Sequence, residues 1–300
     1  MPKIYTVVAD VYDMIYNGVK KIPKKLLKEF NEDINQALTK ALKDGCKSNK
    51  PYLRMSNIGT PARKLWYTLK GYPGSTPTAV QGLQFMYGHI IEAWVIFLVK
   101  LAGHIVKDQQ KVVELDGVKG HQDAEIDGVI IDVKGMSPYG FDKFANGRIL
   151  QDDTFGYIPQ LSGYAQGQDR ELAGFLAFDK QRGRMTMLLL DGGDMVDARQ
   201  KIADARESLK SDTPPPRCYK EIEQGTSGNM ALSKNCEYCP YKHECWKDVN
   251  DGQGLRAFKF KENGEETIRH LTVIKRKPRV EEVTNEKEEV IAEETIEIQI

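Results

Sequence analysis

The stretch GHQDAEIDGVIIDVKG, residues 120–135, decides the expected fold, because it sets aspartates into and around a run of branched aliphatic residues. Asp116-Gly117 precedes it and Asp127-Gly128 lies inside it, and both are turn dipeptides. The segments KVVELDG, VKGHQDAEIDG and VIIDVKG are therefore predicted to form a meander of short strands. The turns by themselves explain Asp116 and Asp127.

Side chains of the last segment are predicted to alternate between two faces of a strand. Val129, Ile131 and Val133 would pack on one face, because successive side chains of a strand point to opposite sides. Asp132 and Lys134 would then project together from the other face. An acid there is costly if it is buried alone. A hairpin whose charged face is solvated is the alternative.

A cation site is predicted where Asp123 comes close to Asp132 across the turn. Two neighbouring carboxylates repel, and a hard divalent cation with oxygen ligands relieves that repulsion. Glu92 is the single acid of the apolar stretch GHIIEAWVIFLVK, residues 88–100, and would have to be neutralised, paired or metal-bound if buried. The alternative is that Glu92 faces water.

The order of elements predicts an α/β protein. Helical segments are expected over 14–46, broken near Pro23 and stopped at Gly45, then after Ser56 or Thr60 as far as Gly71, and over about 81–101. The strands at 111–135 follow. A helix is expected around YIPQLSGYAQG, a strand hairpin over AGFLAFDKQRGRMTMLLLDG, and an amphipathic helix over MVDARQKIADARESLK. LRAFKF and IRHLTVIK indicate a further pair of strands.

Four motifs resemble the RecB-like branch of the PD-(D/E)XK nuclease superfamily, which includes lambda-type exonucleases and the CRISPR-associated and AddB-type iron-sulfur nucleases. They are Gly88 with Glu92, GHQD at 120–123, DVK at 132–134 and QLSGY at 160–164, within about residues 52–246. D-x-K alone is very weak evidence, whereas four ordered motifs are fairly specific. The resemblance implies a restriction-endonuclease-like core with a central mixed sheet flanked by helices, a helical N-terminal part and a cysteine-rich C-terminal metal-binding segment.

The resemblance implies metal ligands at the matching positions. Glu92, Asp123 and Asp132 would hold one or two Mg²⁺ or Mn²⁺ ions, with the carbonyl oxygen of Val133 as a further ligand. Such ions lower the pKa of water and stabilise the negative charge that develops on a phosphate.

Three further residues receive catalytic roles from the same resemblance. Lys134 would orient or help to deprotonate the attacking water and offset charge in the transition state. Gln160 and Tyr164, one helical turn apart, would position the water or the scissile phosphate. The implied reaction is phosphodiester hydrolysis that leaves a 5′-phosphate.

Four of the five cysteines are spaced C-x17-C-x2-C-x5-C, at Cys218, Cys236, Cys239 and Cys245. The N-terminus MPKIYTVVADVYD has no basic stretch leading into an apolar one, so we expect a cytoplasmic protein without a secretory signal. Clustered cysteines then indicate a metal rather than disulfides. Four thiolates suit tetrahedral zinc or an iron-sulfur cluster, and His243 is an alternative zinc ligand. No role is assigned to Cys46.

The resemblance favours a 4Fe-4S cluster, because CRISPR-associated and AddB-type relatives end in a C-x2-C-x5-C trio bound to one. Their first cysteine usually lies upstream of the nuclease core, where this chain has SNIGTPARKLWY without a cysteine. Cys218 could replace it, and structural Zn²⁺ remains the alternative. Either centre would stabilise a segment with little core of its own.

The charge distribution is compatible with a polyanionic substrate. Residues 281–300 carry a net charge of −7, so the first 280 residues carry +7 although the whole chain is neutral. The resemblance implies DNA with a free end or a single strand, bound in a basic and aromatic groove. PARKLWYTLK, residues 61–70, could line that groove; alternatively Trp66 lies in the core. No membrane partner is expected.

The residues and the resemblance together predict a magnesium- or manganese-dependent DNA exonuclease that acts in phage-type DNA recombination, repair or degradation. We expect it in the cytoplasm, which would be the host cytoplasm if the protein is phage-encoded. A recombination protein is a potential partner. One alternative is a structure-specific or restriction-type endonuclease. The other is a non-catalytic nucleic-acid-binding module that is stabilised by a bound metal. The predicted divisions are a helical region at 1–50, a nuclease core at 51–212, a cysteine-rich segment at 213–250, short strands at 251–278 and an acidic disordered tail at 279–300. Oligomeric state is not predicted.

Overall fold

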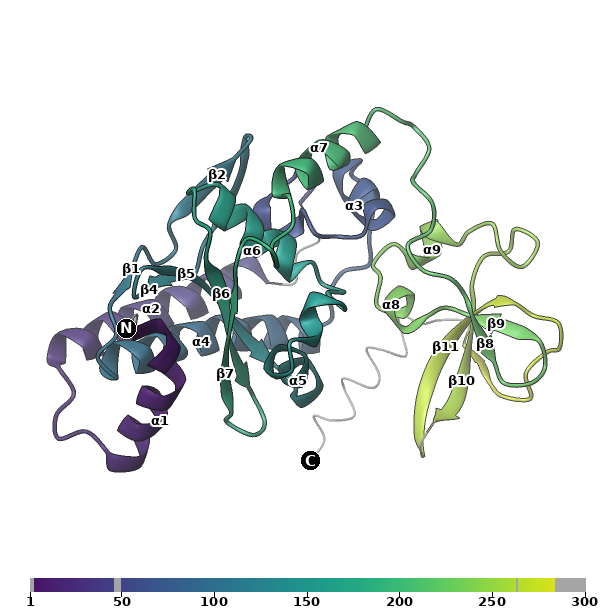
Figure 1. Ribbon diagram of the computed structural model, residues 1–300. Coiled ribbons are helices and arrows are strands. Elements are labelled where there is room, and N and C mark those ends of the chain that lie inside the picture. The colour runs from purple at the N-terminus through teal and green to yellow at the C-terminus, as the bar shows by residue number, and fades with distance from the viewer. Residues whose placement is uncertain (1–2, 46–49, 263, 284–300) are drawn as a thin grey trace. The chain divides into compact units, whose positions relative to one another are not determined.

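The computed structural model describes residues 3–45, 50–262 and 264–283 (Figure 1). Cys46 and residues 284–300 of the predicted acidic tail lie outside the described residues. The chain divides into two compact units. The first is drawn from the N-terminal helices, Pro51–Pro61 and Pro77–Asp212, and the second from Ala62–Thr76 and the described residues after Asp212.

A five-stranded mixed sheet forms the centre of the first unit. Its strands in spatial order are β1 (Val106–Lys107), β4 (Ala124–Ile126), β5 (Val129–Met136), β6 (Ala173–Asp179) and β7 (Met185–Leu190). β5 and β6 run parallel, and the other neighbouring pairs run antiparallel. A parallel pair needs a crossover connection, which the helices between β5 and β6 provide.

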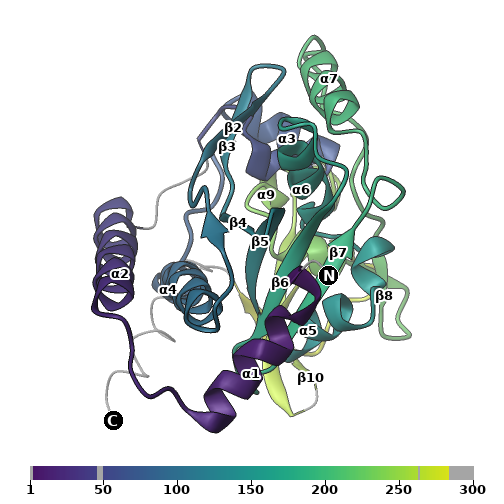
Figure 2. The same cartoon turned by 60° about the vertical axis from the view of Figure 1, so that its left-hand side comes forward.

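Helices cover both faces of this sheet, with α4 on one side and α5 and α6 on the other (Figure 2). Alternation along β5 divides the core as predicted. Val129, Ile131 and Val133 pack with α1 and α4, whereas Ile130 packs with α5, α6 and α7. The helices are α1 (Val7–Asn17), α2 (Lys24–Asp44), α4 (Ala79–Leu101), α5 (Pro138–Ala145), α6 (Tyr157–Gln166) and α7 (Ala198–Ser208), with 3-10 turns η1 (Lys3–Thr6), η2 (Met55–Asn57) and η3 (Arg148–Leu150). The predicted α/β class, with a mixed sheet flanked by helices and a helical N-terminal part, is confirmed.

Helix boundaries follow the signals in the sequence. Pro23 separates α1 from α2, and Gly45, at φ +56°, ends α2. Thr78 and Gln81 form a capping box at the start of α4. By length and composition α4 could also cross a membrane, but residues of its second half such as Val95 and Val99 are fully buried in the core of the unit.

The predicted three-stranded meander is wrong. β2 (Val112–Leu115) and β3 (Val118–His121) form a separate two-stranded sheet, and VKGHQDAEIDG divides into β3 and β4. Beyond β3 the chain continues into β4, which pairs with β1 and β5 instead of with β2. Asp116 and Asp127 have positive φ, as their turns require.

The second unit has an antiparallel sheet in the order β12-β10-β11-β9-β8. The strands are β8 (Ile222–Gln224), β9 (Asn229–Ala231), β10 (Arg256–Glu262), β11 (Glu265–Val273) and β12 (Glu282–Val283), and its helices are α3 (Ala62–Leu69), α8 (Lys234–Glu237) and α9 (Lys242–Cys245). β10 pairs with β11, which confirms the predicted strand pair. Ala231, Phe258 and Leu271 form the core of the sheet.

Candidate active site

The β4–β5 hairpin brings Asp123 to the strand that carries Asp132. Ala124 pairs with Ile131, so the next step of the register places Asp123 opposite Asp132. The Asp123 carboxylate accepts a hydrogen bond of 2.7 Å from the backbone N–H of Val133. The two carboxylates are therefore neighbours because a two-residue turn sets the register.

Asp132 and Lys134 lie on the same face of β5, as predicted, and both are largely buried. Lys134 Nζ lies 2.5 Å from Asp132 Oδ2 and 4.7 Å from the centre of the Tyr157 ring. Among the described residues, no group donates a hydrogen bond of normal geometry to either oxygen of Asp132. A buried carboxylate without hydrogen bonds is rare, because each lost bond to water costs free energy.

Glu92 reaches the same region from α4. Its Oε1 accepts a hydrogen bond of 2.6 Å from Gln110 Nε2. Burial raises the pKa of Glu92 to about 7, with a further contribution from Asp132 and a partial offset from Gln110. Burial, Asp132 and Glu92 together hold the pKa of Asp123 well above its usual range. The three acids therefore repel one another through space.

Lys134 counters part of this negative charge. Burial alone would lower the pKa of Lys134, but the Asp132 and Asp123 carboxylates raise it above its ordinary value. The ammonium therefore stays protonated beside the acids.

The start of α6 supplies the aromatic side of the site. Asp153 accepts hydrogen bonds from the N–H groups of Gly156, Tyr157 and Ile158, which fixes the first turn of this helix. The ring of Tyr157 is thereby held beside Lys134.

Gln160 and Tyr164 lie one turn apart on α6. The Tyr164 hydroxyl donates a hydrogen bond of 2.7 Å to His121 O, and Gln160 Nε2 lies 3.4 Å from that hydroxyl. Tyr164 is buried, so its ring connects α6 to the end of β3.

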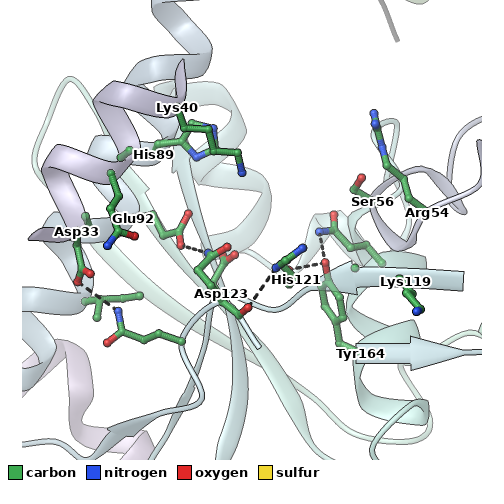
Figure 3. Close-up of a pocket in the computed structure, with 18 of the residues that line it drawn as sticks. Asp33, Lys40, Arg54, Ser56, His89, Glu92, Lys119, His121, Asp123 and Tyr164 are labelled. Carbon is green, nitrogen blue, oxygen red and sulfur yellow. Dashed lines mark hydrogen bonds between the residues drawn. The ribbon is translucent and has the colours of Figure 1, made fainter. Parts of the chain in front are cut away.

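A cavity of about 800 Å³ opens at these side chains (Figure 3). Four predicted site residues line it: Glu92, Asp123, Gln160 and Tyr164. Asp132, Val133 and Lys134 are not part of its lining. Basic side chains from separate segments also face the cavity, at Lys40, Arg54, His89, Lys119 and His121.

Sequence patterns did not identify Tyr157 and Gln110, which contact the predicted residues directly. Tyr157 lies three residues before Gln160 on α6, and this helical spacing was the available signal. No sequence pattern pointed to Gln110, because it contacts Glu92 from a loop in which its own φ is positive, and a loop has no periodicity that would reveal this contact. The alternative for Trp66 is confirmed, since Trp66 and its neighbour Tyr67 are buried in the second unit.

The donor set suits a hard cation, because Oδ1 of the buried Asp132 has no hydrogen-bond partner among the described residues, Oδ2 is paired with Lys134 alone, and two further carboxylates approach Asp132. Among the described residues, however, no three His, Cys, Asp or Glu side chains stand as a preformed metal site. The cation predicted at Glu92, Asp123, Asp132 and the Val133 carbonyl stays a prediction.

The second unit brings the four predicted cysteines into one neighbourhood. Cys236 is buried with Leu232 and Trp246, Cys239 and Cys245 are half-buried, and Cys218 is exposed. Burial raises the pKa of each of the Cys236, Cys239 and Cys245 thiols, and each also senses the charge of other cysteines of the set.

Cationic groups surround these thiols. Arg63 interacts with the Cys245 thiol, which lowers the pKa of that thiol in opposition to burial, and Lys64 acts on Cys239 in the same direction. Arg217 Nε donates to Cys245 O and its guanidinium stacks 3.9 Å from the centre of the Trp246 ring. Thiols clustered with cations suit a bound metal centre, whose ligands are thiolates. Zinc and an iron-sulfur cluster both remain predictions.

No protein-family model matches this chain, and no curated protein matches it. Solved structures similar to it include the protein SSO0001, with a TM-score of 0.39, 13% identity and coverage of 70% of this chain and 93% of that one. An alkaline exonuclease from Laribacter hongkongensis has a TM-score of 0.39 at 12% identity, covering 54% of this chain and 89% of its own. A phage-related exonuclease from Haemophilus somnus 129PT has a TM-score of 0.35 at 19% identity, covering 53% and 90%. At these scores the similarities carry no argument about activity.

Proposed function

We propose that this protein is a deoxyribonuclease that requires Mg²⁺ or Mn²⁺ and hydrolyses phosphodiester bonds. The observation that carries the proposal is the convergence of the half-buried Glu92 and Asp123 on the buried Asp132 beside Lys134. Without a bound cation this group is destabilising, because the Asp132 carboxylate contributes to raising the pKa of both Glu92 and Asp123. The order of its motifs, which resembles RecB-like nucleases, supports the same assignment.

Glu92, Asp123, Asp132 and the carbonyl of Val133 are the groups that would hold the cation. When bound, it would supply positive charge to the phosphate and lower the pKa of water. The same charge would relieve the repulsion that raises the pKa values of Glu92 and Asp123. Lys134 now occupies one oxygen of Asp132, so a cation and the ammonium would compete for that carboxylate.

The remaining residues of the site would orient the reacting groups. Lys134, released from part of its ion pair, would offer an ammonium to the attacked phosphate or its water. Gln160 lines the cavity with its Nε2 directed to Tyr164, and no group in the described part of the chain donates to its side-chain oxygen. Tyr164 would act by holding β3 against α6 through the His121 carbonyl.

The cavity fits a nucleic-acid backbone in charge. Lys40 comes from α2, Arg54 from the segment before η2 and Lys119 from β3, so three cations from separate segments line the cavity that Glu92 and Asp123 also line. Phosphates neutralised by such groups contribute most of the affinity for DNA. DNA with a free end or a single strand is the proposed substrate, within phage-type recombination, repair or degradation.

The cysteine set is proposed to hold a 4Fe-4S cluster or a structural Zn²⁺ through Cys218, Cys236, Cys239 and Cys245. Its role would be to stabilise the segment around α8 and α9, whose own apolar core is small. Structural zinc sites contribute roughly 10–16 kcal/mol of apparent binding energy in small peptides, enough to decide whether such a segment folds.

The test is digestion of end-labelled single- and double-stranded DNA with and without Mg²⁺ by the parent, Asp132→Ala, Lys134→Ala and the control Asp169→Asn. Asp169 is an exposed acid of the same unit with positive φ, which asparagine tolerates. We expect metal-dependent cleavage by the parent and the control only. Cleavage by folded Asp132→Ala at the parental rate would refute the proposal.

Circular single-stranded DNA, digested beside the linear substrates, separates an exonuclease from an endonuclease. Resistance of the circle supports the exonuclease. Cutting of the circle instead identifies an endonuclease. DNA binding with no cleavage under any metal condition would identify the non-catalytic binding module.

A further inference from the structure

The second unit carries an exposed run of cations that the candidate active site does not use. The segment KRKPR, residues 275–279, follows β11 and contains four basic residues in five. All four basic side chains are exposed. Runs of this kind occur where proteins contact nucleic acid, although sequence alone does not distinguish them from solvated charge.

Among the described residues, acids pair with only one of the four cations of this run, Lys277. Glu282 is held by Arg256 through two contacts of 2.7 Å and lies 3.7 Å from Lys277, while Glu281 lies 3.6 Å from Lys259. Among the described residues, no carboxylate lies within ion-pair distance of Lys275, Arg276 or Arg279. These three cations are therefore available to a ligand.

A buried asparagine holds the backbone of the run in place. Asn229 Oδ1 accepts hydrogen bonds from the N–H groups of Lys275 and Arg276, at 2.9 and 3.0 Å. Its Nδ2 donates to Arg276 O at 2.8 Å. Three hydrogen bonds from one buried side chain make the segment rigid before any ligand binds, which reduces the entropy lost on binding. A solvated charge run needs no such clamp.

The clamped segment forms one wall of a cavity of about 440 Å³. Arg276, Lys277 and Arg279 line it, together with Ser227 from the β8–β9 turn and Phe260 on β10. A serine and an aromatic residue thus line the cavity beside the cations, and these residue types are common partners of nucleic-acid backbones and bases.

We propose that this cavity, with Arg276 and Arg279 as its main ligands, binds the sugar-phosphate backbone of nucleic acid. Guanidinium groups match the oxygens of a phosphate in a fixed fork, and Asn229 holds the backbone at Arg276 in place. The inference rests on the proposed function only in naming DNA as the nucleic acid. This binding surface belongs to the second unit, whereas Glu92, Asp123 and Asp132 belong to the first.

The test compares Arg276→Gln/Arg279→Gln with the matched control Lys234→Gln/Lys261→Gln. The control removes two positive charges from exposed positions of the same unit outside the cavity. Binding of the full chain to labelled DNA of about 30 nucleotides is followed by fluorescence anisotropy without added Mg²⁺ or Mn²⁺, which prevents cleavage and leaves the cysteine centre in place, over about 50 to 200 mM salt.

We expect the arginine variant to bind DNA about tenfold more weakly at the lower salt and its salt slope to fall by about 1.4 to 1.8, because each phosphate contact contributes about 0.7 to 0.9. The control should keep the parental slope. Equal affinities and slopes for the two variants would overturn the proposal. The proposal would also be overturned if the arginine variant bound DNA normally but lost binding to vesicles of phosphatidylcholine and phosphatidylserine in equal parts. That result would identify the surface as one that binds lipid.

The two proposals fail separately in this design. If the parent binds DNA through the arginines without added Mg²⁺ or Mn²⁺ but does not cleave when Mg²⁺ is present, only the hydrolytic site is refuted. If the parent cleaves DNA but the arginine variant binds DNA as tightly as the control variant, only the second binding surface is refuted.

Discussion

Lys134 Nζ lies 2.5 Å from Asp132 Oδ2, and both groups are enclosed on one face of β5. If the two compete with a cation, Lys134→Met should bind Mn²⁺ at least as tightly as the parent, because the ammonium no longer occupies Asp132. Its cleavage rate should nevertheless fall by roughly 10²-fold or more, the range for a lost proton-transfer or charge-stabilising group. Isothermal titration calorimetry and single-turnover digestion measure the two effects.

Asp132→Asn is the matched comparison, since it should lose both metal binding and cleavage. If Lys134→Met lost as much Mn²⁺ affinity as Asp132→Asn, Lys134 would be needed to shape the metal site. The hypothesis that the Lys134 ammonium and the metal ion compete for Asp132 would then be wrong.

Glu92 should make the metal-free protein less stable as the pH rises. The pKa of Glu92 is raised from an ordinary 4.5 to about 7, because the folded state disfavours the ionised carboxylate. The free energy of unfolding therefore falls as the pH rises above 4.5, and the full loss is reached above about pH 7. In EDTA, Glu92→Gln should raise the Tm at pH 8 by a few degrees, since about 1 kcal/mol corresponds to roughly 2–4 °C in a protein of this size. At pH 4.5 the two proteins should unfold together. Calorimetry at both pH values checks this, and an equal gain at both would contradict the assigned charge.

Gln110 should set the pH range of activity through its 2.6 Å hydrogen bond to Glu92. Gln110→Asn is too short to reach Glu92 and tolerates the positive φ of this position. Without the hydrogen bond the pKa of Glu92 rises further, so the acidic limb of the kcat/KM profile should move to higher pH. Activity at high pH should approach that of the parent.

Gln109→Asn is the control for this change, because Gln109 is the adjacent loop residue and its side chain is directed to Asp33 instead. A uniform loss of activity at every pH in Gln110→Asn would show a purely structural role.

The backbones of Gly59 and Gly156 approach so closely that neither position has room for a side chain. A Cβ on Gly59 would lie 2.5 Å from Gly156 Cα. Gly59→Ala should therefore lower the free energy of unfolding by about 1–3 kcal/mol, as overpacking does. Gly88→Ala on α4 is the control, since a Cβ there meets nothing within 4 Å and helical alanine stabilises by about 0.5–1 kcal/mol relative to glycine. Urea unfolding compares them, and equal effects would refute the close contact as the cause.

The cysteine segment should depend on its metal centre for stability. Cys236→Ser and Cys239→Ser should each lose the centre and unfold at lower temperature, whereas Cys46→Ser should behave like the parent. A broad visible absorbance in anaerobically purified protein identifies an iron-sulfur cluster, and a colourless protein with stoichiometric zinc identifies Zn²⁺. The proposed metal centre would be refuted if the purified parent contained neither iron nor zinc and unfolded at the same temperature as the cysteine variants.

The sequence by itself determined the local features of this protein. The turn Asp127-Gly128 and the alternation along β5 placed Asp123 opposite Asp132 and put Lys134 on the same face, because strand period and hairpin register act over a few residues. The helices that follow Pro23 and Thr78 were predictable for the same reason.

Tertiary structure alone decided what those residues experience. Glu92 approaches Asp132 from a separate helix, Gln110 reaches Glu92 from a loop, and Asn229 clamps a segment that lies far along the chain. The division of the expected meander into two sheets has the same origin. Burial, electrostatic coupling and cavity shape depend on how distant segments pack, and periodicity carries no information about that packing.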